Sequence, residues 1–272
     1  MIETIQEMLQ YTFIQRAVLV GSLVSVCAAL LGVSLVLKRY AMIGDGLSHV
    51  GFGILTIATA FGLTPLPIAI PGVIIFAILL LKIGNKSNIK SDSAIALLSS
   101  SSLAIGVAIT SLTTGLNTDV CNFMFGSILA MSESDVYLSI TVSIIVAILF
   151  VIYYRKLFAV TFDEDFSRAS GLNVTWYTNI IAILTAVVIV VGMRMMGTML
   201  ISSIIIFPAL TSMRVFKSFK KVVISSGIVS IITFLIGIYF SYIYNISTGA
   251  TIVLVNLVAF VIFSIVGKIV NE

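Results

Sequence analysis

Long uncharged stretches recur along the chain, and short segments between them hold nearly all of its charges. The uncharged runs cover residues 17–37, 46–81, 93–118, 120–132, 136–154, 169–193, 195–213 and 222–267. A transmembrane helix needs about 20 mainly apolar residues, so most of these runs are long enough to cross a bilayer. The hydrophobic pattern therefore predicts a series of membrane helices joined by short loops.

Two of the runs are long enough for two crossings, and one is too short for a single crossing. The run 46–81 is interrupted by the prolines of 62–67, and the run 222–267 by the polar segment 245–249, because proline and clustered small polar residues end helices. This count gives nine spans. We predict an all-α polytopic membrane protein with eight to nine transmembrane helices and a short re-entrant or interfacial helix within 119–132.

The composition restricts the class of protein further. Of the 272 residues, 60% are hydrophobic and 10% are charged, and the mean hydropathy is +1.21. Soluble domains have about 45–50% apolar and about 25% charged residues, so a soluble enzyme, a disordered chain and a nucleic-acid-binding protein are excluded. The two cysteines, Cys27 and Cys121, form no C-x-x-C motif, and we interpret them as small packing residues.

The positive charges indicate which loops face the cytoplasm. When the nine spans alternate across the membrane, 13 of the 15 Lys and Arg residues fall on one side, which is predicted to be cytoplasmic because short cytoplasmic loops are enriched in Lys and Arg. These residues are Lys38, Arg39, Lys82, Lys86, Lys90, Arg155, Lys156, Arg168, Arg214, Lys217, Lys220, Lys221 and Lys268. Arg16 and Arg194 fall on the opposite side. A crossing by 119–132 would reverse the sides of the spans before it.

One ionisable pair stands inside an apolar segment. Asp45 and His49, the only histidine, are four residues apart, so on a helix they share one face. Ionisable residues within membrane helices usually face a cavity or a partner, and a carboxylate with an imidazole suits Zn²⁺, Mn²⁺ or Fe²⁺. The pair therefore indicates a metal site. Two structural alternatives are open: Asp45 as a helix N-cap, and His49 as an interhelical hydrogen-bonding residue.

Small residues surround this pair. These residues are glycines, and because a glycine has no side chain, another backbone or subunit can approach the helix closely at each of them. The positions are Gly44, Gly46, Gly51 and Gly53.

Three motifs in chain order resemble those of the integral-membrane permeases of bacterial divalent-metal ABC importers, which take up manganese, zinc and iron. Residues 44–49 (GDGLSH) are similar to the family's G-D-x-[LI]-[SA]-H motif. Residues 197–209 (GTMLISSIIIFPA) are similar to its G-x-L-L-x-x-x-L-L-x-x-P-A helix, and residues 249–254 (GATIVL) to its last membrane helix. The similarity extends over residues 17–267, which is nearly the whole chain.

The resemblance implies a single transmembrane permease domain over 1–272 that imports a divalent zinc, manganese or iron ion across a bacterial plasma membrane. It further implies a homodimer, two ATP-binding cassette subunits on the cytoplasmic side and an extracytoplasmic metal-binding protein, with Asp45 and His49 on the metal pathway. The ion is then a transported substrate, and no cofactor is expected to stay bound. The chain lacks a G-x-x-x-x-G-K-[ST] phosphate loop, so we expect no enzyme activity here and the ATPase on a separate subunit.

The segment 162–172 has the pattern of a short helix between two spans. Acids open it, an arginine follows, and a glycine stands near its end, where helix C-termini favour glycine. Composition alone is equally consistent with a solvated loop helix. In the resembling permeases this position holds the coupling helix that docks on the ATPase, and we expect the same contact here. The residues concerned are Asp163, Glu164, Asp165, Phe166, Arg168 and Gly171.

Other functions fit the pattern less well. An ion-coupled secondary transporter would need several buried carboxylates and an inverted repeat. An intramembrane hydrolase would need a metal motif or a serine with a separate histidine base. A permease for a siderophore or another metal chelate would have the same architecture and stays an alternative. The sequence does not select the metal, because nitrogen and oxygen ligands generally bind Zn²⁺ more tightly than Mn²⁺. The methionines of 193–199 are interpreted as packing residues rather than as a soft-metal path.

Overall fold

The computed structural model describes residues 7–8, 10–86, 91–113, 124, 126 and 133–271. Within these ranges the chain forms helices and no strand, so the all-α prediction is confirmed for them. The helices are α2 (Thr12–Leu37), α3 (Ala41–Ala60), α4 (Pro65–Lys86), α5 (Ser91–Leu112), α7 (Glu133–Phe162), α8 (Glu164–Ala169), α9 (Val174–Val215), α10 (Phe219–Tyr244) and α11 (Thr248–Asn271). The predicted short helix within 119–132 lies outside the described residues, apart from Met124 and Gly126.

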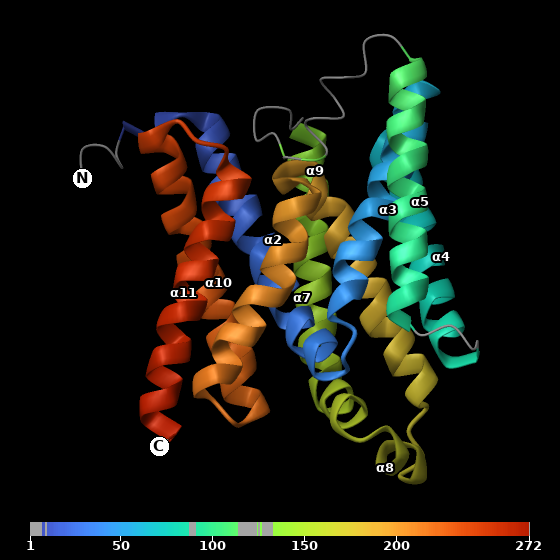
Figure 1. Ribbon diagram of the computed structural model, residues 1–272, viewed down its shortest axis with the longest axis vertical. Helices are drawn as coiled ribbons and strands as arrows, with labels where there is room; N and C mark the ends of the chain where they lie inside the picture. The colour runs from blue at the N-terminus through green and yellow to red at the C-terminus, as the bar shows by residue number, and fades with distance from the viewer. Residues whose placement is uncertain are drawn as a thin grey trace.

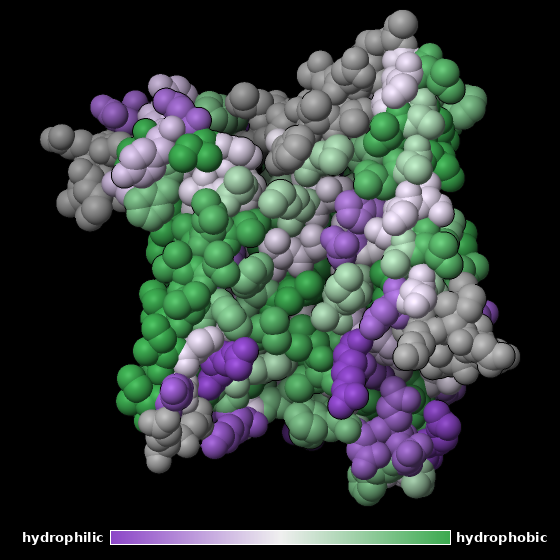
Figure 2. Space-filling model, in the orientation of Figure 1, coloured by the Kyte–Doolittle hydropathy of each residue, from purple (hydrophilic) through white to green (hydrophobic). Residues whose placement is uncertain are grey.

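Eight of these helices, all except the six-residue α8, are long and apolar enough to cross a membrane. They stand side by side along the long axis of the molecule, with α8 beyond one end (Figure 1). At that end α2 and α11 finish and α10 begins, next to Lys38, Lys268 and Lys221. We call it the basic end. Figure 2 shows hydrophilic side chains gathered there, below a largely apolar surface.

Helix α9 is broken within its length. It contains 42 residues, which at about 1.5 Å per residue give roughly twice the thickness of a bilayer's hydrocarbon core of about 30 Å. The backbone leaves helical geometry at Gly197, where φ is 81° and ψ is 163°. This region of backbone space is accessible almost only to glycine, so Gly197 sets where the helix turns.

The two ends of α9 lie together at the basic end. Tyr177, in its first turn, packs on Tyr153 of α7 with ring centroids 6.0 Å apart, and Phe219, just after its end, packs on the adjacent Tyr154 at 5.5 Å. The halves of α9 therefore cross separately. They correspond to the predicted spans 169–193 and 195–213. Together with the seven other long helices they give the nine predicted passes.

The opposite end of the bundle holds the turn of α9. Arg194 lies just before Gly197 and pairs with Asp135, near the start of α7, at 3.1 Å. Arg16, near the start of α2, pairs with Glu133 at 2.5 Å. The two arginines that the charge count set apart from the other cations thus lie at the end away from α8, as predicted.

The centre of the bundle is formed by α2 and α9, which pack against each other extensively. A hydroxyl group joins α10 to this centre, since Ser230 donates to the carbonyl of Ser25 at 2.9 Å. Small polar residues let membrane helices approach closely and bond to each other. Cys27 is buried in the same region, as predicted for a packing residue, and Cys121 lies outside the described residues.

Two glycines make a matched test of this packing. A Cβ on Gly32 of α2 would overlap the carbonyl oxygen of Ile205 in α9, whereas a Cβ on Gly227 of α10 would meet no atom within 4 Å. We expect Gly32→Ala to lower the melting temperature of the purified protein by several degrees, because overpacking costs about 1–3 kcal/mol. Gly227→Ala should leave it unchanged or slightly higher, because alanine favours helices. Equal melting temperatures for the two variants would contradict the close contact of α2 with α9.

Candidate functional site

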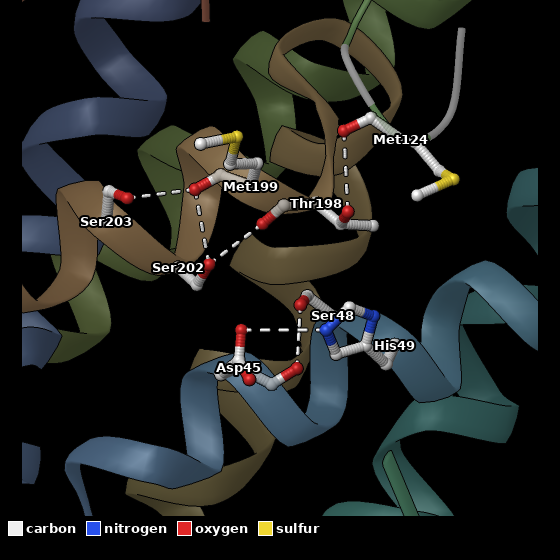
Figure 3. Close-up of polar contacts among 8 residues, drawn as sticks. All are labelled: Asp45, Ser48, His49, Met124, Thr198, Met199, Ser202 and Ser203. Carbon is white, nitrogen blue, oxygen red and sulfur yellow. Dashed lines mark hydrogen bonds and ion pairs between the residues drawn. The ribbon is translucent and has the colours of Figure 1, made fainter. Parts of the chain in front are cut away.

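Asp45 and His49 lie one turn apart on α3, with Nε2 of His49 3.7 Å from Oδ1 of Asp45 (Figure 3). The helix begins at Ala41 after the N-cap residue Tyr40. Asp45 is therefore inside the helix, and the alternative that it caps the N-terminus is wrong. His49 stands eight residues after Ala41, about 12 Å along the axis, which is close to the middle of this 20-residue helix.

The two side chains keep unused coordinating capacity. The side chain of His49 is 23% exposed and that of Asp45 is 43% exposed. Nδ1 of His49 is buried and has no hydrogen-bond partner, and no hydrogen bond joins His49 to another helix within the described ranges. The interhelical hydrogen-bonding alternative is therefore wrong for this part of the chain. An imidazole nitrogen and a carboxylate without strong partners are suited to a cation.

Glycines allow α5 and α9 to close around this part of α3. A Cβ on Gly53 would lie 2.7 Å from the carbonyl oxygen of Ser102 in α5, and one on Gly51 would lie 2.7 Å from the sulfur of Met193 in α9. The prediction that another backbone or side chain approaches these glycines closely is thus confirmed. At Gly51 and Gly53 the neighbour is a helix of the same chain.

The segment 162–172 contains the predicted short helix. Asp163 is the N-cap of α8, and its carboxylate accepts a hydrogen bond from the backbone N–H of Phe166 at 2.8 Å. Gly171 has φ 82°, and the backbone N–H of Leu172 donates to the carbonyl of Ser167 at 3.0 Å. This is the Schellman arrangement that favours glycine after a helix. Phe166 is 68% exposed.

An ion pair between a buried lysine and a half-exposed glutamate joins α8 to the bundle. Nζ of Lys38, at the end of α2, lies 2.6 Å from Oε1 of Glu164 and donates to the hydroxyl of Thr178 in α9 at 3.1 Å. The Lys38 side chain is 3% exposed and that of Glu164 is 45% exposed. Burial, and then the charge of Glu164, raise the pKa of Tyr40 above its ordinary value.

A cavity of about 380 Å³ separates α8 from the helices above it. Arg168 and Glu164 of α8 line it together with Lys82 of α4 and Asn179 of α9. Arg168 lines this cavity and is also exposed, and Phe166 is exposed on α8. Of the six predicted coupling residues, the structure assigns Asp163 and Gly171 to the helix caps and Glu164 to the ion pair with Lys38. Asp165 is exposed on α8 as well.

Comparison with known proteins assigns the family. A model of the ABC 3 transport family matches residues 10–267. The chain belongs to this family. The manganese import system permease protein ScaB of Streptococcus gordonii is 30% identical over 260 residues, which cover 96% of this chain and 93% of ScaB. The manganese transport system membrane protein MntC of Listeria monocytogenes is 29% identical over 258 residues, which cover 95% of this chain and 92% of MntC.

A solved structure gives the same result. A chain of PsaBC from Streptococcus pneumoniae, determined in complex with Fab, has a TM-score of 0.87 and 30% sequence identity, and the match covers 97% of this chain and 95% of that one. The chain described here is thus an ABC transporter permease and a multi-pass protein of a bacterial plasma membrane. The resemblance inferred from its three motifs is confirmed.

Sequence reasoning missed two polar residues of this ABC 3 permease. Thr198 and Ser202 follow the break in α9, and Figure 3 shows the turn that carries them across from Asp45 and His49. Ser202 donates to the carbonyl of Thr198 at 2.9 Å, and Thr198 donates to the carbonyl of Met124 at 3.4 Å. Thr198 directly follows the glycine of the 197–209 motif and Ser202 lies one helical turn after Thr198, and this position was the available signal.

The methionines beside this break mostly pack in the core. Met193, Met195 and Met196 are buried, as predicted, while Met199 is 54% exposed. Within the described ranges, no group of three or more His, Cys, Asp or Glu side chains could hold a metal ion. In the part of the chain that the structure describes, the Asp45–His49 pair therefore has no third His, Cys, Asp or Glu ligand, and a complete site needs more oxygen or nitrogen atoms.

Proposed function

We propose that this permease is the membrane subunit of an ATP-driven importer that carries Mn²⁺ into the cytoplasm. The observation that carries the proposal is the open Asp45–His49 pair in the middle of a membrane helix, in a chain whose relatives ScaB and MntC are named for manganese. Carboxylate, hydroxyl and carbonyl oxygens suit Mn²⁺, and such groups occur on Asp45 and on the α9 turn that faces it. Zn²⁺ and Fe²⁺ have less support.

The metal site is completed by a second copy of the chain. A divalent transition metal needs four or more ligands, and the Asp45–His49 pair of one chain supplies two, with no further His, Cys, Asp or Glu beside it among the described residues. A two-fold axis beside α3 brings two carboxylates and two imidazoles together without any further residue type, and isologous dimers are the commonest homo-oligomers. The ion is the transported substrate in this arrangement, and no cofactor stays bound.

The two ends of the bundle support the positions of the partners in this proposal. The basic end faces the cytoplasm, because Lys and Arg are retained on that side of a membrane. Two ATP-binding cassette subunits dock there on residues 162–172 of the single permease domain, with the exposed Phe166 as the apolar contact. They supply the ATP hydrolysis, since this chain has no phosphate loop. An extracytoplasmic metal-binding protein delivers the ion to the opposite end.

Ion uptake by cells tests the proposed cargo. A bacterial strain without its own manganese importer, expressing the permease together with an ATP-binding cassette subunit and a metal-binding protein from the same genome, should accumulate radioactive Mn²⁺ above the empty-vector level. Unlabelled Mn²⁺ should compete for uptake, and elemental analysis should identify manganese as the metal retained by the cells. Competition by Zn²⁺ alone does not identify the cargo, because Zn²⁺ binds nitrogen and oxygen ligands more tightly whether or not it is carried. Faster uptake of an iron chelate than of Mn²⁺ would favour the siderophore alternative and overturn the proposal.

Reversal of one charge tests the role of α8. We expect Arg168→Glu to lower Mn²⁺ uptake by about tenfold or more, because a like-charge contact at an interface costs several kcal/mol and each 1.4 kcal/mol is about tenfold. The amount of permease in the membrane should stay normal, while ATP hydrolysis by the complex continues without transport. Lys217→Glu, a reversal at the same end but outside α8, serves as the control. Normal uptake by the Arg168 variant would remove α8 from the coupling pathway.

A further inference from the structure

A groove of about 410 Å³ runs along the outer surface between α10 and α11. Three isoleucines spaced four residues apart, Ile224, Ile228 and Ile232, line its α10 side, and each is about half exposed. Phe263 lines its α11 side. The groove is apolar almost throughout, and one cation, Lys221, stands among its lining residues.

The dimensions of the groove match one leaflet of a bilayer. Lys221 and Ile232 are eleven residues apart on α10, which corresponds to about 16 Å along the helix. Half of a hydrocarbon core of about 30 Å is nearly the same length. Because α10 begins at the basic end, the groove extends from the predicted cytoplasmic surface to the middle of the membrane, with its cation at the surface.

The charge at this end of the groove is not neutralised by the chain. Residues 166–271 contain seven Lys and Arg and no Asp or Glu. Lys217, Lys220 and Lys221 form no ion pair within the described ranges. An anion at this end of the groove therefore meets Lys221, and Lys217 and Lys220 lie within four residues of it in the sequence.

We propose that this groove binds an anionic phospholipid of the cytoplasmic leaflet. One acyl chain lies along Ile224, Ile228 and Ile232, and the phosphate of the headgroup lies against the ammonium group of Lys221. Basic clusters at the cytoplasmic end of membrane helices attract anionic lipids, and the groove adds a fixed place for the chain.

A second copy of the permease is a poorer occupant on electrostatic grounds. A two-fold contact over the groove would bring two copies of Lys217, Lys220 and Lys221 together, with no acid from residues 166–271 to offset them. The proposed metal site also needs its two-fold axis beside α3, which packs mainly against α4, α5 and α9 rather than against α10 or α11. The groove is therefore open to lipid when the dimer forms on α3.

Lipid titration of the purified full-length permease tests this site. Native mass spectrometry would count bound phosphatidylglycerol and phosphatidylcholine with identical acyl chains. We expect phosphatidylglycerol to bind about fivefold more tightly, because one cation near an anionic lipid surface contributes about that factor. Lys221→Gln should remove this preference, and Ile228→Trp, which fills the groove, should weaken both lipids. Lys268→Gln, which removes a cation at the same end but outside the groove, should behave as the unaltered protein.

Three results would overturn the site. Equal affinity of the unaltered permease for the two lipids would remove the role of Lys221. Competition by soluble glycerophosphate as strong as that by the intact lipid would show that the acyl groove contributes nothing. Disulfide formation between two copies through Ile228→Cys in native membranes would show that a second permease, rather than lipid, covers the groove.

Discussion

Replacing either Asp45 or His49 by alanine is expected to abolish Mn²⁺ uptake, with a loss of about 100-fold or more. Mutation of groups that only support a metal ligand costs about 10–100-fold in affinity or activity, and removal of a ligand itself should cost at least that. Each substitution also acts twice in a homodimer, because both copies lose the same ligand. Uptake of radioactive Mn²⁺ measures the effect, and the amount of permease in the membrane must be unchanged.

Asp92→Ala is the matched control for this experiment. Asp92 is an exposed carboxylate in the first turn of α5, so its removal changes the net charge equally without touching the α3 pair. We expect normal uptake from this variant. Substantial uptake by the Asp45 or His49 variant would show that the pair is not on the metal pathway.

The proposed dimeric site also predicts how many metal ions the purified protein binds. Purified permease should bind one Mn²⁺ per two chains, and a mixed dimer of one normal chain with one Asp45→Ala/His49→Ala chain should bind none tightly, because it keeps only two of four ligands. Elemental analysis of affinity-purified mixed dimers measures this directly. One ion per chain, or full binding by the mixed dimer, would place the missing ligands within each chain.

Local features of the sequence predict the local structure of this permease well. The run of uncharged residues, the prolines of 62–67 and the acid-to-glycine order of 162–172 each depend on interactions within a few turns. The helices, the nine passes and the capped α8 could therefore be predicted. Placing Asp45 within α3 rather than at its start needed the structure, because Gly44 and the preceding charges fitted a helix start there equally well.

Contacts between distant segments could not be predicted in the same way. Lys38 and Glu164 are 126 residues apart, and either could have faced water on its own helix. The turn at Gly197 brings Thr198 and Ser202 across from Asp45, yet a glycine in a membrane helix is also common at tight helix contacts. Only the packing of α3, α8 and α9 shows that Lys38 pairs with Glu164 and that Gly197 forms a turn rather than a tight helix contact.

The contact between Lys38 and Glu164 predicts an unequal effect of removing its two members. Without Glu164, the ammonium group of Lys38 stays buried with only the hydroxyl of Thr178 as a partner, and an uncompensated buried charge is strongly destabilising. Without Lys38, the carboxylate of Glu164 is left at a position that is 45% exposed, where water can solvate it. The first loss is therefore the larger one.

We expect Glu164→Ala to destabilise the permease by about 2 kcal/mol, which lowers the melting temperature by roughly 5 °C. Lys38→Met, which keeps the aliphatic stem, should cost about half as much or less. The double variant should be more stable than Glu164→Ala alone, because it no longer buries a charge. Thermal unfolding of the purified protein, followed by size-exclusion chromatography after heating, measures all three. A greater loss from Lys38→Met than from Glu164→Ala would mean that the contacts of the ammonium group with Glu164 and Thr178 matter more to stability than the cost of burying that group without its acid.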